Sequence, residues 1–134
     1  MNRLKCRVTS VSNSGMLTKI DMLCDDIALT AFAIEMDLDS ICKDDEVVVL
    51  FKESEVSIAK SFVGEISLQN RFTCKIEDIQ KGDLLAQLRL SFFNHYIDSI
   101  ISMKAVQNMD LQVGDNVTAL VKSTEMIVTD IDDE

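Results

Sequence analysis

The sequence repeats itself once, and this repeat limits the architectures that the chain can adopt. Residues 2–8 (NRLKCRV) align with residues 70–76 (NRFTCKI) at an offset of 68, with Asn, Arg and Cys identical. Residues 45–55 align with residues 115–125 at an offset of 70. Self-similarity over this distance is typical of a chain that is built from copies of one structural unit.

The two offsets differ, so the second copy contains a two-residue insertion. We place it near residues 92–96 (FFNHY), where it predicts a lengthened hairpin turn. The join between the copies, residues 59–66 (AKSFVGEI), is too short for a free linker. The sequence therefore predicts two modules, residues 1–64 and residues 65–134, that pack against each other.

Apolar and polar residues alternate within each copy. In the second copy Phe72, Cys74 and Ile76 alternate with polar residues, which is typical of a half-buried strand. The pattern further predicts a short helix at residues 103–108, a turn at 114–115, and strands at 84–90, 96–101, 117–121 and 126–128. Five short strands with a helix after the third are typical of an OB-like barrel. The predicted fold class is all-β, with two tandem OB-like five-stranded barrels, each with one short helix.

A barrel of about 65 residues is marginal alone, because small domains bury a smaller share of their surface. With 47% hydrophobic residues the chain has enough apolar material for a core. Exchange of strands between copies or oligomerisation would increase the buried area. We therefore expect an assembly.

The charge and the apolar runs exclude several classes of function. The net charge of −10 argues against direct binding of nucleic acid, which needs clustered Lys and Arg. No apolar run approaches the roughly 20 residues that span a bilayer, so membrane insertion is not expected. The first residues lead into an alternating strand and lack the apolar stretch of a signal peptide. We expect a cytoplasmic protein.

The cysteines and the single histidine do not suggest a metal site or an enzyme. Cys6, Cys24, Cys42 and Cys74 form no CxxC pair, so we expect core or half-buried free thiols and no metal ligands. His95 has no nucleophile or carboxylate that the sequence pairs with it, and we expect a loop or surface residue. The sequence predicts a protein that is not an enzyme.

The second copy also contains an ordered series of short motifs. They are SLQN (67–70), ISMKA (101–105), MDLQVGD (109–115) and VTALVKST (117–124). Their order and spacing resemble the repeating unit of the molbindin (Mop/TOBE) family. The resemblance covers residues 67–129 and extends more weakly over residues 2–60, so the whole chain resembles a tandem di-Mop protein.

The resemblance implies a cytoplasmic, homo-oligomeric protein that binds molybdate or tungstate between packed modules, for storage or homeostasis of molybdenum. A dianion must exchange its hydration for N–H groups, hydroxyls and a cation. The metal would be present only as the oxyanion. The resemblance places the oxyanion-binding residues at Ser67, Gln69, Asn70, Arg71, Ser102, Ala105, Lys122 and Ser123 of the second copy, and at Asn2, Arg3 and Lys52 of the first.

Several positions depart from the family pattern. Gln69 stands where the family has Arg, and Arg71, on the same strand face, is the candidate to replace it. Ala105 stands at a hydroxyl position and offers only its backbone amide. The first copy departs further, because Glu35 and Glu53 would oppose a bound dianion, and Met1 and Phe32 also replace family residues. We expect the second copy to keep the better site.

Two other functions remain to be weighed. The chain could be a non-catalytic regulatory or interaction module of a molybdate-responsive system, with a partly lost oxyanion site and a partner protein. The degenerate first copy and the acidic tail favour this alternative slightly. An OB-like nucleic-acid binder is disfavoured by the charge and by the lack of aromatic platforms.

Overall fold

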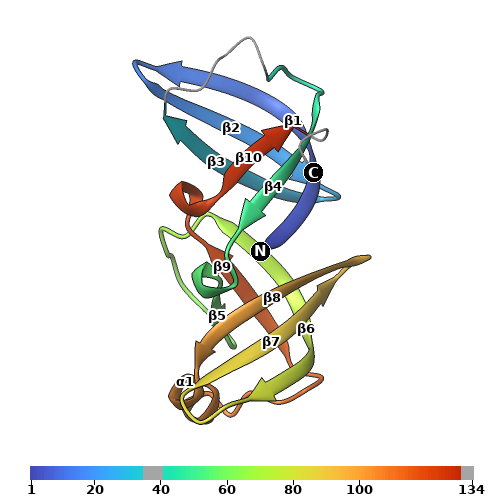
Figure 1. The fold of residues 1–134 in the computed structure, drawn as a ribbon, viewed down its shortest axis with the longest axis vertical. Helices are drawn as coiled ribbons and strands as arrows, with labels where there is room; N and C mark the ends of the chain where they lie inside the picture. Colours follow the sequence, from blue (N-terminus) through green and yellow to red (C-terminus); the bar gives the residue numbers. More distant parts are fainter. Residues whose placement is uncertain (35–40, 131–134) are drawn as a thin grey trace.

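The computed structural model describes residues 1–34 and 41–130, which form two β-modules stacked along the long axis of the molecule (Figure 1). Among these residues, no helix is long and apolar enough to cross a membrane. The first half of the chain forms β1 (Asn2–Ser14), β2 (Leu17–Cys24), β3 (Ile27–Ile34), β4 (Glu46–Phe51), the 3-10 turn η2 (Glu53–Glu55) and β5 (Ser57–Ala59).

The second half repeats this order, with a helix described between its third and fourth strands. It forms β6 (Asn70–Lys81), β7 (Leu85–Phe92), β8 (His95–Ser102), α1 (Met103–Asn108), β9 (Asn116–Val121), the 3-10 turn η3 (Ser123–Glu125) and β10 (Ile127–Asp130). The predicted all-β class with two five-stranded units is confirmed. The predicted helix at residues 103–108 is also confirmed, whereas its counterpart in the first copy falls on residues outside the described ranges.

The last strand of each half belongs to the sheet of the other half. The strand orders are β10-β4-β1-β2-β3 and β5-β9-β6-β7-β8. Ile127 of β10 pairs antiparallel with Leu50 of β4, and Ser57 of β5 pairs with Leu120 of β9. In Figure 1, β10 crosses into the upper module beside β4, and β5 lies in the lower module beside β9. Each module therefore depends on the other for its fifth strand.

The repeat insertion lies elsewhere than the sequence suggested. Residues Asp25 and Asp26 join β2 to β3, and two residues, Phe93 and Asn94, likewise join β7 to β8. The first residue of each turn has a positive φ, 52° at Asp25 and 50° at Phe93. The offset of 68 holds through these hairpins to Ser102, and it reaches 70 only at β9. The predicted longer turn near residues 92–96 is therefore wrong, and the two extra residues lie between β8 and β9.

The alternating pattern produces a core that continues from one module into the other. Phe72, Cys74 and Ile76 are buried, as predicted. The rings of Phe51 on β4 and Phe72 on β6 stack at 6.0 Å between centroids, so aromatic packing crosses the junction. All four cysteines are free thiols. Three are buried, but Cys42 is exposed, because it precedes the turn that leads into β4, and the prediction of a buried or half-buried thiol is wrong there.

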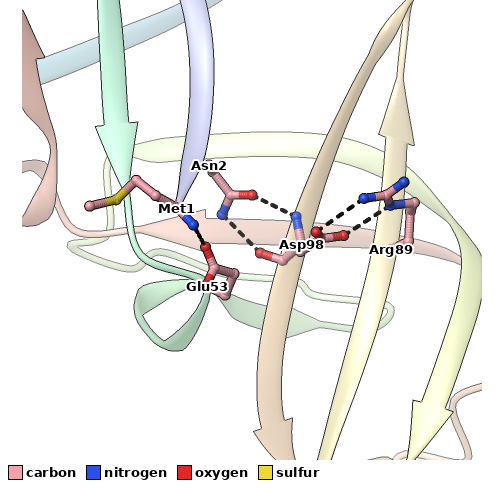
Figure 2. A network of polar contacts seen from close by, with 5 residues as sticks. All are labelled: Met1, Asn2, Glu53, Arg89 and Asp98. Atoms are coloured by element: carbon pink, nitrogen blue, oxygen red, sulfur yellow. Dashed lines mark hydrogen bonds and ion pairs between the residues drawn. The ribbon is translucent and has the colours of Figure 1, made fainter. Parts of the chain in front are cut away.

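Two equivalent asparagines fasten the modules together. The Asn70 side chain accepts a hydrogen bond from the Thr30 amide (2.7 Å) and donates one to the Thr30 carbonyl (2.9 Å). Asn2 makes the same pair of bonds with the backbone of Asp98, at 2.7 and 2.9 Å (Figure 2). Asn2 and Asn70 are equivalent in the repeat, as are Thr30 and Asp98, so the junction has approximate two-fold symmetry. The starting residue of each module's first strand thereby binds the third strand of the other.

We predict that Asn70→Ala lowers the free energy of unfolding by about 2 to 3 kcal/mol, because it removes both partners of the part-buried Thr30 amide and carbonyl. Denaturant unfolding of the full chain measures this change. Asn108→Ala, at an exposed position at the end of α1, is the matched control and should change stability little. Equal stability of the two variants would contradict the role of Asn70 at the junction.

Candidate functional site at the module junction

The two predicted lysines stand where the chain crosses from one module to the other. Lys52 follows β4 and precedes η2, and Lys122 follows β9 and precedes η3. Both lysines are exposed. Because the strands are exchanged, η2 packs against β8 of the second module and η3 packs against β3 of the first. Each lysine thus begins a turn that contacts the other module.

This crossing divides the predicted site residues into two sets. Lys122 and Ser123 begin the turn against β3, where Asn70 is also bound. Ser102 ends β8, which is the strand that contacts η2 after Lys52. The structure therefore groups the strand of Ser102 with the lysine of the first copy. The sequence does not reveal this grouping, because both copies carry the same motifs and do not show which partners meet.

Ser102 is the N-cap of α1. Its Oγ accepts a hydrogen bond from the amide of Ala105 at 3.1 Å, and the Met103 amide donates to the Leu84 carbonyl at 2.9 Å. The predicted donor at Ala105 is therefore already used by the cap. The Ser102 hydroxyl can still donate its own hydrogen, because accepting a bond leaves the O–H group available.

The remaining predicted residues of the second copy lie just before or at the start of β6. Ser67, Gln69 and Arg71 are exposed. The Arg71 guanidinium donates to the carbonyls of Ile66 (3.1 Å) and Leu68 (3.2 Å). Arg71 is thus held against the segment that precedes its own strand. Its counterpart in the first copy, Arg3, is also exposed.

Asn2 and Asn70 are buried, and their side-chain amides bind the neighbouring strand as described above. The structure gives them a role in holding the modules together. Their binding of an oxyanion stays a prediction.

Carboxylates accompany the lysines. The Glu53 carboxylate forms an ion pair with the Met1 amino group (Figure 2). In the same region Nε and Nη2 of Arg89 donate to the two carboxylate oxygens of Asp98, at 3.1 and 3.3 Å. This interaction raises the pKa of Arg89. Glu35, the other carboxylate that we expected to oppose an anion, lies outside the described residues.

A pair of glutamates, one from each turn, also joins the copies. The carboxyl groups of Glu55 and Glu125 contact each other, and the hydrogen bond from one to the other raises the pKa of Glu55. This pair was not predicted from the sequence. The repeat does contain the signal, since Glu55 and Glu125 are equivalent residues of the two turns, and equivalent residues meet where they lie on the symmetry axis.

Comparison with known proteins identifies the family. Residues 66–128 match the family model of the TOBE domain. The chain is 35% identical to a molybdate-binding protein from Sporomusa ovata, over 98% of that chain and 49% of this one, with a TM-score of 0.48. The chain belongs to the TOBE-domain family. No curated protein sequence matches it.

The whole two-module fold of this TOBE protein has a known relative. The structure of ModG, described as a cytoplasmic molybdate-binding protein and solved with molybdate bound, matches with a TM-score of 0.90 at 22% sequence identity. The match covers 96% of this chain and 95% of ModG. The two proteins therefore share the fold, and the resemblance to a di-Mop protein is confirmed.

We predict that Glu55→Gln stabilises the protein at neutral pH. The raised pKa of Glu55 means that the protonated pair stabilises the folded state below the usual Glu pKa of about 4.3, and that this contribution is lost as the pH rises through the higher folded-state pKa. Removing the repulsion should raise the free energy of unfolding at pH 7 by a few tenths of a kcal/mol after solvent screening. Unfolding as a function of pH measures it. Glu65→Gln, at an exposed position, is the control, and an equal effect of both changes would contradict the pairing.

Proposed function

We propose that this chain is a non-enzymatic molybdate-binding protein that holds the anion, for storage or homeostasis of molybdenum, at the junction between modules. The observation that carries the proposal is the crossing of the two lysine turns. Lys52 and Lys122 each begin a turn that packs on the third strand of the other module. A cation from one copy is thereby combined with polar groups from the other.

The chemistry of the junction suits an oxyanion. The chain as a whole carries a net charge of −10 and repels a dianion, so binding needs local cations and donors that replace water. The Lys52 and Lys122 ammonium groups supply charge, and the Ser102 and Ser123 hydroxyls supply donors. The known function of ModG and of the Sporomusa ovata protein supports the same ligand. Tungstate has the same shape and charge as molybdate, and we propose that it binds too.

We propose that the site is completed in a cytoplasmic homo-oligomer. Large apolar side chains are exposed at the ends of the second and third strands of each module. In the first module Leu17 and Ile34 pair with each other and are 42% and 72% exposed. In the second module Leu84 and Leu85 are 82% and 58% exposed, and Leu85 pairs with Ser102. Further copies that cover these residues would also exclude water from the neighbouring Ser102.

A specific observation favours the alternative, an interaction module with a reduced site. Ile34 is the residue of the first copy that is equivalent to Ser102, so the first copy lacks this hydroxyl. A chain of this kind would act through a partner protein and bind the anion weakly.

We predict that Lys122→Ala and Lys52→Ala each weaken molybdate binding by about 10- to 100-fold, because each removes a charged contact. Isothermal titration of the full chain with molybdate and with tungstate measures the loss. Sulfate serves as the anion control. Lys43→Ala, at an exposed position outside both turns, is the matched control and should bind as the unmodified protein does.

The absence of binding heat for both anions, in a protein that is folded, would contradict the storage function and favour the interaction module. Unchanged affinity in both lysine variants, with molybdate still bound, would contradict the assignment of the site to the two turns.

A further inference from the structure

Three side chains that are distant in sequence gather where the turn between β2 and β3 meets the start of β8. Cys24 ends β2, Asp25 follows it in the turn, and His95 is the first residue of β8 in the other module. Nε2 of His95 lies 2.6 Å from Oδ2 of Asp25 and 3.7 Å from Sγ of Cys24. One ligand atom from each residue lies within 4.8 Å of the other two. A thiol, an imidazole and a carboxylate thus converge on one point.

We propose that Cys24, Asp25 and His95 bind one divalent transition-metal ion of the zinc class across the module junction. Such ions are bound by thiolate, imidazole and carboxylate in tetrahedral sites. With Zn–S near 2.3 Å and Zn–N near 2.0 Å, a tetrahedral ion separates sulfur from nitrogen by about 3.5 Å. The separation of 3.7 Å between Cys24 and His95 is close to this value. The shorter contact of Asp25 with His95 would widen as the ion replaces the shared proton.

The surroundings hold the ligands in place. Cys24 is buried, and the His95 ring lies against the buried Phe92 ring at 5.2 Å between centroids. Cys6, on β1, is a buried neighbour of Cys24. Its thiol donates to the Leu4 carbonyl at 3.9 Å.

The cluster is accessible to an ion from solvent. A cavity of about 330 Å³ adjoins it, lined by Lys5, Cys6, Arg7, Leu23, Asp25 and Glu46. Arg7 is engaged by Asp44 at 3.1 Å, which offsets one of the two cations in the lining. Three protein ligands beside an open cavity leave a fourth position of the ion for water or a small ligand.

The fold itself does not require these residues. At the equivalent positions of the repeat, Phe92 stands for Cys24, Phe93 stands for Asp25, and Ile27 stands for His95. Both copies make the same two-residue turn, so the architecture accepts apolar residues there. A simple ion pair between Asp25 and His95 would explain two of the three side chains, but not the buried sulfur beside them. The expectation of no metal ligands rested on sequence spacing, and it could not foresee a cluster whose members come from different modules.

The test is a titration of the full chain with Co²⁺, which replaces Zn²⁺ in such sites and reports thiolate ligation by a charge-transfer absorption. All titrations use the Cys42→Ser protein as the parent, because this change removes the exposed thiol. The reductant contains no thiol. We expect one Co²⁺ per chain, the charge-transfer band, and displacement of Co²⁺ by Zn²⁺. His95→Gln and Asp25→Asn should each weaken binding at least about tenfold, and Zn²⁺ should raise Tm, since it binds only the folded state.

The matched control is Cys74→Ser, because Cys74 is the buried equivalent of Cys6 in the second module, and it should leave binding unchanged. Circular dichroism without metal establishes that each variant is folded; Asp25 is exposed, so Asp25→Asn should keep the fold. Binding without the charge-transfer band, no binding at all, or equal affinity in His95→Gln and the parent would overturn the proposal. None of these results depends on molybdate, so the proposed function is tested separately.

Discussion

The exchange of the last strand between the two modules is the constraint on which the rest of the structure depends. β10 completes the sheet of the first module, and β5 completes the sheet of the second. A unit of about 65 residues buries too little surface to be secure alone, and here each unit also lacks an edge strand without its partner. The stacked rings of Phe51 and Phe72 and the amides of Asn2 and Asn70 lie along the junction that the exchange creates.

The same exchange determines where chemistry can take place. Because η2 and η3 directly precede the crossing strands β5 and β10, each turn of one copy meets the third strand of the other. The two ends of the junction are equivalent in backbone but differ in side chains. Ser102 is matched by Ile34, and Cys24 and His95 are matched by Phe92 and Ile27. A duplicated fold thus carries polar side chains at one position and apolar side chains at its equivalent, and the two copies need not share one function.

Much of the fold could be predicted because it is encoded locally. Alternation places Phe72, Cys74 and Ile76 in the core, and the capping residue Ser102 and the turn at Gly114 bound the segment that contains α1. Strand exchange could be predicted only as an alternative to oligomerisation for increasing the buried area. The sequences of β5 and β10 do not show which of the two sheets each strand joins.

The site was less predictable, because it depends on contacts between copies. The motif of the second copy suggested that Ser102 and Lys122 act together, but the crossing brings the turn η2 of the first copy against β8, the strand that ends at Ser102. The contact between Cys24 and His95 joins residues that are 71 positions apart. No spacing rule for metal ligands extends over such a separation when the chain between them contains strands of both modules.

The most direct test of interdependence between the modules is differential scanning calorimetry of the full chain. If each module completes the sheet of the other, they unfold together. We then expect one transition, with a calorimetric enthalpy equal to the van't Hoff enthalpy. Two resolved transitions, or a calorimetric enthalpy well above the van't Hoff value, would show that the modules unfold independently and would contradict the account.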